Sequence, residues 1–331
     1  MSVAVAAMLF TVLEAYGIFA GADFGAGFWD LTAGGAARGR EPRALIDHSI
    51  GPVWEANHVW LVFVLVISWT AFPPAFVAVM RTLYVPLGLA ALGIVLRGSG
   101  FAFRKVSVRT AAQRANGAMF ALSSVMTPFF FGCAAGAIAT GRVPGTGGSG
   151  PLVIWFTPAC LFTGALTVLI CAYLAAVFLT AEARARRNPT LEAYFRGRAL
   201  GMAIAAGVIA LGGLAVVRAD TPHLFHRLLG PALPLVLVSV VAGGGVLVAI
   251  RKADPRIVRV LAAGAVAALI AGWGVAQYPY LLGNHLSIHR AASPGPTLDA
   301  VAGIFIVAAL LVLPSLGVLY LLHLRGRLES V

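Results

Sequence analysis

The sequence predicts an all-α protein, a polytopic bundle of about nine transmembrane helices in one domain over residues 1–331. Hydrophobic residues make up 60% of the chain and charged residues 11%, with a mean hydropathy of +0.92, unlike soluble domains. The apolar residues form blocks of about twenty or more, the length that a helix needs to cross about 30 Å of hydrocarbon. The net charge of +12 sits in short connections between these blocks, which indicates a membrane surface, so no nucleic-acid partner is expected.

The apolar blocks predict the helices in chain order. They cover residues of about 3–29, 54–78, 82–103, 115–139, 153–181, 199–217, 229–250, 257–280 and 300–323. The first follows no basic segment and precedes no convincing cleavage site, so we expect a retained helix and not a signal peptide. Pro52 suits the start of the second, Pro279 would end the eighth, and Ser293 or Thr297 could cap the ninth. No connection is long enough for a separate soluble domain.

The basic residues give the orientation. Of the 24 Lys and Arg residues, 18 fall on alternate connections and on the C-terminal tail, five fall on the other side, and Arg97 lies inside the third span. Because cytoplasmic loops carry the excess of Lys and Arg, this bias predicts an outside N-terminus and a cytoplasmic C-terminus.

Metal and haem sites have little support in the sequence. Cys133, Cys160 and Cys171 all lie in apolar runs and form no C-x-x-C pattern. Of the histidines, His58 and His323 fall within predicted spans, and a lone membrane histidine is more often a packing or relay residue than a haem ligand. We therefore expect no metal and no cofactor-binding site in this chain.

Asp23 is one of four ionisable residues in the predicted spans, and each needs a partner, a water-filled cavity or a function. The four are Glu14, Asp23, Glu55 and Arg97. At 100° per residue, Asp23 shares a helix face with Tyr16 and Asp30, seven residues before and after it. This stripe would lead inward from the cytoplasmic surface.

Glu14 falls on the opposite face, in line with Gly17, Gly21 and Gly25. Small residues at this spacing let another helix approach closely, so we expect Glu14 to be buried against protein.

Glu55 opens the second span and has two interpretations. It could be a capping carboxylate at the positive end of the helix dipole, beside interfacial Trp54 and Trp60. Alternatively, Glu55 and His58, one turn later, could exchange protons with the cytoplasm. Arg97 would either snorkel to the interface or pair with a carboxylate at similar depth, such as Asp23.

At these residues the sequence resembles subunit II of cytochrome bd-type quinol oxidases, including the cyanide-insensitive branch. Residues 23–27, D-F-G-A-G, match the second half of the family's D-G-F-D-L-G-x-G pattern. Residues 50–61, I-G-P-V-W-E-A-N-H-V-W-L, are close to its I-x-P-x-W-D-G-N-x-V-W-L. Further similarities follow in the family's order at residues 71–73, 96–104, 272–279 and 293–298, so the likeness runs from the first helix to the ninth.

The resemblance implies a haem-free subunit of a quinol:oxygen oxidoreductase in a bacterial or archaeal plasma membrane. Its partner in a heterodimer would be subunit I, which carries haem b, haem d and the quinol site. Quinol would be the substrate of the complex, and the chemistry would take place in the partner. The resemblance leaves open small accessory subunits and a structurally bound quinone or lipid.

The resemblance also suggests roles for the polar residues. Asp23 and Glu55 would form a cytoplasmic proton inlet, with Asp30 at its mouth and His58 or Tyr16 as relays. Structural or orienting roles would fall to a second set, which comprises Arg97, Glu14, Asn57 and Trp54. Two departures from the family pattern, Ala20 in place of an acid and Glu55 in place of aspartate, could alter proton uptake.

Two other functions stay open at this point. Membrane acids with Gly- and Pro-interrupted spans would also suit a proton-coupled secondary transporter, although no internal repeat is evident. A purely structural assembly subunit would use the same acids only in buried pairs.

Overall fold

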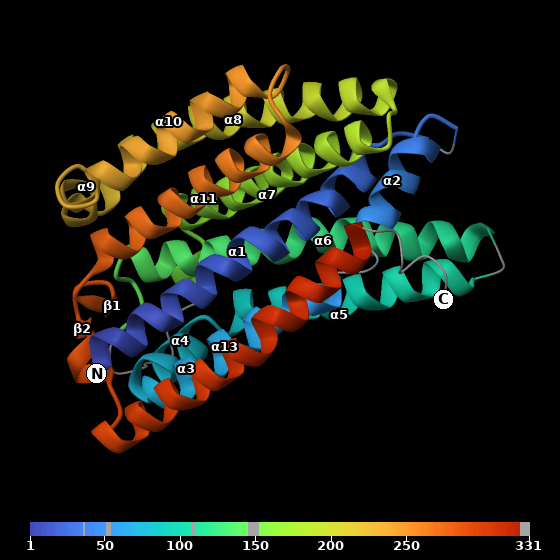
Figure 1. Cartoon of the computed structure of the whole chain (residues 1–331). Coiled ribbons are helices and arrows are strands. Elements are labelled where there is room, and N and C mark those ends of the chain that lie inside the picture. Colours follow the sequence, from blue (N-terminus) through green and yellow to red (C-terminus); the bar gives the residue numbers. More distant parts are fainter. Residues whose placement is uncertain (36, 51–53, 108–109, 145–151, 325–331) are drawn as a thin grey trace.

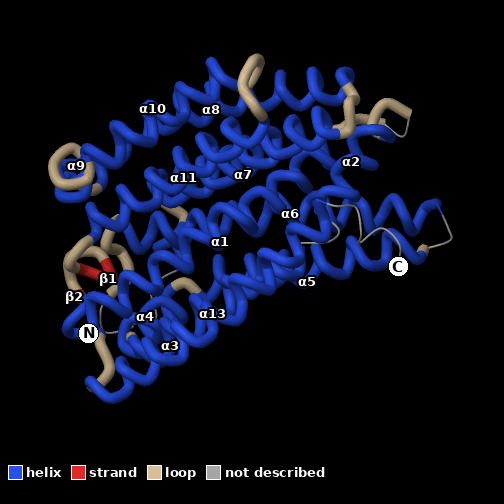
Figure 2. Tube along the Cα trace, viewed as in Figure 1, coloured by secondary structure: helices blue, strands red, loops and turns tan. Residues whose placement is uncertain are grey.

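The computed structural model is a bundle of long helices with one short hairpin (Figures 1 and 2). It describes residues 1–35, 37–50, 54–107, 110–144 and 152–324. Seven helices in these ranges are long and apolar enough to cross a membrane. They are α1 (Ser2–Thr32), α5 (Tyr84–Val106), α6 (Thr110–Ala139), α7 (Pro158–Ala185), α8 (Pro189–Asp220), α11 (Pro255–Gln277) and α13 (Gly295–Leu324). The predicted all-α polytopic bundle is confirmed.

Two further spans are bent pairs of helices. The pair α3 (Trp54–Ala71) and α4 (Pro73–Thr82) bends by 117°, and the pair α9 (Pro222–Leu228) and α10 (Leu233–Ala249) bends by 68°. Counting each pair as one span gives up to nine, the predicted number. The described connections hold three short helical segments and one β-hairpin. These are α2 (Arg40–Ile50), the 3₁₀ turn η1 (Leu152–Trp155), the hairpin of β1 (Tyr280–Leu282) and β2 (Leu286–Ser287), and α12 (Ile288–Ala291).

The break between α3 and α4 corrects the expectation of one continuous helix over 54–78. Pro73 and Pro74 have no backbone N–H, so carbonyls in the preceding turn lose their helical donors. Ser293 supplies two replacements: its hydroxyl donates to Thr70 O (2.8 Å) and its backbone N–H donates to Ala71 O (2.9 Å). Ser293 therefore stabilises the break between α3 and α4. The sequence had suggested it as a cap of α13, and its hydroxyl does not have that role.

Helix α1 is the centre of the bundle and contacts α3, α6, α7 and α11. The expected close approach of another helix to its glycine stripe is confirmed. A methyl group at Gly25 would lie 1.8 Å from the backbone oxygen of Cys171 in α7, and one at Gly17 would lie 3.0 Å from the Ile270 side chain of α11. The absence of a side chain at Gly25 lets α1 meet the backbone of α7, and at Gly17 it makes room for a side chain of α11.

The helix ends gather at two opposite sides of the bundle (Figure 1). One side, here called the α2 end, holds α2 together with the C-terminal ends of α1, α5 and α7. The other, the hairpin end, holds the N-terminus, α9 and the β1–β2 hairpin. This grouping agrees with the alternation of the basic connections, and the assignment of the α2 end to the cytoplasm stays a prediction.

Candidate functional site

Asp23 lies in the interior of the bundle, where α1 faces α3. Asp23 is only 6% exposed, and Asn57 of α3 is 3% exposed. The Asn57 amide donates to Asp23 Oδ2 at 2.5 Å and to the Phe19 carbonyl at 3.5 Å. The rings of Phe19 and Trp60 stack beside this pair with centroids 6.2 Å apart. A neutral amide is therefore the direct partner of this buried carboxyl group.

Arg97 of α5 is 1% exposed and lies next to Asp23. Its Nη2 donates to the backbone carbonyl of Asp23 (3.1 Å) and its Nε donates to Ser124 Oγ of α6 (3.1 Å). The guanidinium also lies about equally far from the rings of Phe24 and Phe120, at 5.1 and 5.2 Å. Among the residues that the structure describes, no carboxylate oxygen lies within 4 Å of it. Arg97 is therefore buried and does not snorkel, which corrects that expectation, and it makes no salt bridge to the Asp23 side chain. Pairing with another carboxylate, such as that of Glu55, stays untested because the Glu55 side chain lies outside the described residues.

Tyr16 and His58 complete the inner cluster. Tyr16 is buried on the same face of α1 as Asp23, seven residues before it. The Tyr16 ring lies 6.2 Å from the His58 ring. The Phe24 ring is also 6.2 Å from that of His58. The Tyr16 hydroxyl is buried, and within the described residues it has no hydrogen-bond partner. The structure therefore brings three residues of the predicted proton path, Tyr16, Asp23 and His58, to the interface of α1 and α3.

Asp30 forms a separate network at the α2 end. Arg43 Nε binds one of its carboxylate oxygens at 2.7 Å and Arg104 Nη1 binds the other at 2.5 Å. Arg104 also reaches Asp47 of α2 at 3.0 Å. Both Asp30 oxygens are therefore engaged, and the network fastens α2 to α1 and α5.

The two aspartates of α1 and the two arginines of α5 have the same spacing. Asp23 and Asp30 are seven residues apart, as are Arg97 and Arg104. Arg104 forms a salt bridge with the Asp30 side chain, whereas Arg97 donates a hydrogen bond to the backbone carbonyl of Asp23. The same seven-residue spacing on both helices thus gives two different kinds of pairing.

The remaining predicted residues have different outcomes. The side chains of Glu55 and Trp54 lie outside the described residues, so their roles stay predictions. We expected Glu14 to be buried against protein, but in this chain it is only half-buried. It makes no hydrogen bond or ion pair with any residue in the described ranges.

Sequence reasoning missed Ser124. The residue is 1% exposed and binds Arg97, while its own hydroxyl donates to Phe120 O at 2.7 Å. A methyl group at Gly27 of α1 would lie 2.2 Å from Ser124 Cβ, so α6 packs closely against α1 at this level. The available signal was the polar pair Ser123-Ser124 within an apolar span.

The described residues include no group of three or more His, Cys, Asp or Glu side chains that could hold a metal ion. The cysteines predicted to be buried, Cys133, Cys160 and Cys171, are buried and free.

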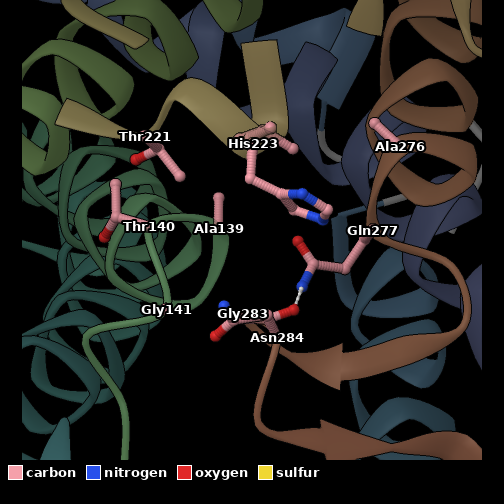
Figure 3. Close-up of a pocket in the computed structure, with 10 residues that line it drawn as sticks. Ala139, Thr140, Gly141, Thr221, His223, Ala276, Gln277, Gly283 and Asn284 are labelled. Carbon is pink, nitrogen blue, oxygen red and sulfur yellow. Dashed lines mark hydrogen bonds between the residues drawn. The ribbon is translucent and has the colours of Figure 1, made fainter. Parts of the chain in front are cut away.

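A small cavity lies at the hairpin end (Figure 3). Its volume is about 60 Å³, and its walls come from the ends of α6 and α11, the α8–α9 junction and the hairpin turn. Gln277 spans it and donates to Gly283 O at 2.8 Å. Gly141 (φ 70°) and Gly283 (φ 50°) adopt the left-handed conformation that glycine tolerates and touch through their backbones. We interpret this feature as the junction that closes the bundle at this end.

Comparisons with known proteins agree with the fold. The family model described as cytochrome bd terminal oxidase subunit II matches residues 1–323. The cytochrome bd ubiquinol oxidase subunit 2 of Bacillus subtilis (strain 168) is 32% identical over 84 residues, which span 25% of this chain and 24% of that relative. The structure of bd oxidase from Geobacillus thermodenitrificans superposes with a TM-score of 0.78 at 23% identity, covering 100% of this chain and 99% of that one.

Proposed function

Since the chain belongs to the cytochrome bd terminal oxidase subunit II family, we propose that it is the haem-free subunit of a quinol:oxygen oxidoreductase and supplies a cytoplasmic proton path for reduction of dioxygen to water. The family and the candidate spans make it a multi-pass plasma-membrane protein of the respiratory chain. In this proposal haem b and haem d belong to subunit I, the partner in a heterodimer, where quinol is oxidised.

The proton path proposed here runs through Asp23, with Glu55 as its second acid and His58 and Tyr16 as relays. The observation that best supports this path is that the buried Asp23 carboxyl group has a neutral hydrogen-bond partner, Asn57. A carboxylate bound directly by a guanidinium is held in its charged form. A carboxyl group with an amide partner in the membrane interior can gain and release a proton more readily, so this contact supports a relay role.

Asp30 has a weaker claim to the mouth of the path. Two arginines occupy its oxygens, so protons would reach it only after Arg43 or Arg104 had moved. We therefore place the entry nearer to Glu55 and His58 and treat Asp30 as the anchor of α2.

The test uses the whole complex, purified through a tag on this chain. Asp23→Asn and Glu55→Gln should each slow quinol-driven oxygen consumption per haem by about tenfold or more, since general acid–base groups contribute on this scale. The reduced-minus-oxidised spectrum should show unchanged haem b and d bands. Asp299→Asn is the matched control, because this exposed acid lies at the start of α13, far from the cluster.

A purely structural role is the second candidate, favoured by the double pairing of Asp30. In that case Asp23→Asn would lower the yield of haem-containing complex and its thermal stability, and the turnover of each remaining haem would stay normal. A colourless chain that purifies alone would instead contradict the oxidase proposal and favour a transporter.

A further inference from the structure

One strip of α1 is uncovered although α1 is the central helix. Ala4, Ala7 and Thr11 are exposed along it, and α1 passes between α11 and α13 at this place (Figure 1). We call these three residues and Glu14 the open strip. Small side chains at a spacing of three and four residues permit another helix to approach closely.

Glu14 is the member of the open strip nearest to the middle of α1. It lies about 18 Å along the helix from Ser2 at 1.5 Å per residue, which is hydrocarbon depth in a bilayer. The Thr11 hydroxyl cannot serve it as a donor, because it donates to the Ala7 carbonyl at 2.9 Å. Within the described residues Glu14 makes no ion pair or hydrogen bond. A carboxyl group at this depth requires a polar partner.

On one side of the open strip, the α11 groups that contact α1 are mainly apolar, although the buried indole N–H of Trp273 has no hydrogen-bond partner among the described residues. The Phe10 ring lies 6.0 Å from that of Trp273, and it fills the space above Gly274. One turn further, Gly17 packs against the Ile270 side chain. Glu14 falls between these two contacts in the sequence, so α11 gives it packing and no ionic partner.

On the other side, α13 and α1 form an apolar groove of about 290 Å³. Met8 contributes from α1, and the other lining residues belong to α13: Phe305, Ile306, Ala309, Leu310, Leu313 and Pro314. Ile306 is 52% exposed and Leu310 is 69% exposed. The groove thus continues the open strip as a wide apolar surface.

We propose that a transmembrane helix of a partner chain lies along the open strip between α11 and α13 and gives Glu14 a hydrogen bond or a positive charge. A lipid tail would fill the apolar groove, but it carries no donor at this depth. A helix with small or apolar residues and one Lys, Arg, His, Ser or Thr facing Glu14 satisfies both the groove and the carboxyl group. The inference rests on membership of a multi-subunit oxidase family and not on the proton path.

A photoreactive amino acid at Ala7, introduced into the complete complex in native membranes, tests the contact. Ala215 is the matched control, because it is an exposed alanine on α8, a helix that packs against α7 and lies away from the open strip. The expected result is a crosslink from position 7 to one membrane-spanning segment with a donor residue near its middle, and none from position 215. Adducts to lipid alone at both positions, or a segment without a donor, would overturn the proposal.

The role of Glu14 is tested with the same probe. Glu14→Leu should reduce the crosslink from position 7 by about tenfold or more, because the partner's donor would be buried without an acceptor. Glu14→Gln keeps an acceptor and should retain most of the crosslink. An unchanged crosslink in Glu14→Leu would show that the carboxyl group does not hold the partner helix. Unchanged haem bands in both variants would establish that the complex has assembled.

Discussion

Arg97 holds the backbone of Asp23 and leaves its carboxyl group to Asn57. The guanidinium Nη2 lies 3.1 Å from the Asp23 carbonyl oxygen, and the Asn57 amide lies 2.5 Å from Asp23 Oδ2. The positive charge therefore fixes the position of α1 without a direct salt bridge to its acid. This division lets a buried arginine and a buried acid occupy neighbouring sites with separate tasks.

Ser124 should matter for stability through Arg97. Ser124→Ala removes the acceptor of Arg97 Nε, and a charged donor left unsatisfied in the interior costs about 3 kcal/mol or more. Ser123→Ala is the control, because the Ser123 hydroxyl donates only to Met119 O and Phe120 O of its own helix. Thermal unfolding of the purified complex should show a clearly larger loss for Ser124→Ala. Equal losses would mean that the Arg97 contact contributes little.

Asp30 should control the attachment of α2. Asp30→Asn leaves Arg43 and Arg104 without their shared anion, and breaking a buried pair costs about 3–5 kcal/mol. Hydrogen exchange of the α2 amides should accelerate. Asp220→Asn breaks the more exposed pair with Arg142 and should cost about 0–1 kcal/mol. Unchanged exchange in α2 after Asp30→Asn would argue that the helix is held by its apolar contacts alone.

Gly25 should tolerate no side chain. In Gly25→Ala the new methyl would lie 1.8 Å from Cys171 O, so α1 and α7 must separate at a cost of about 3 kcal/mol or more. No described atom lies within 4 Å of a methyl placed at Gly201 of α8, and Gly201→Ala should be neutral or stabilising by about 1 kcal/mol. The yield and melting temperature of the complex would measure the difference. Similar values for both variants would refute the close packing.

Ser293 should stabilise the bend between α3 and α4. Ser293→Ala removes the donor to Thr70 O, and leaving this carbonyl without a partner costs about 1–3 kcal/mol. Ser315→Ala is the control, because that exposed hydroxyl donates to Leu311 O within α13 and its loss should change little. Thermal unfolding again gives the comparison. An unchanged melting temperature in Ser293→Ala would show that the hydrogen bond from the Ser293 backbone N–H to Ala71 O is sufficient to stabilise the bend.

The sequence by itself determined the membrane architecture. The length and hydropathy of each span are properties of consecutive residues, so the count of up to nine spans was predictable. The glycine stripe of α1 was also readable, because residues at positions 17, 21 and 25 share a helix face whatever packs against it. For the same reason Tyr16, Asp23 and Asp30 were placed on one face, and all three are buried.

Only the tertiary structure decided which group each polar residue meets. Asp23 and Arg97 are 74 residues apart in sequence, and a shift of about 1.5 Å between their helices, one residue's rise, could exchange a backbone contact for a salt bridge. Likewise, the pairing of Asp30 with Arg104, the contact of Ser124 with Arg97 and the reach of Ser293 to Thr70 depend on how separate helices dock. Helical periodicity fixes the face on which a side chain lies, but its partner is set by long-range packing.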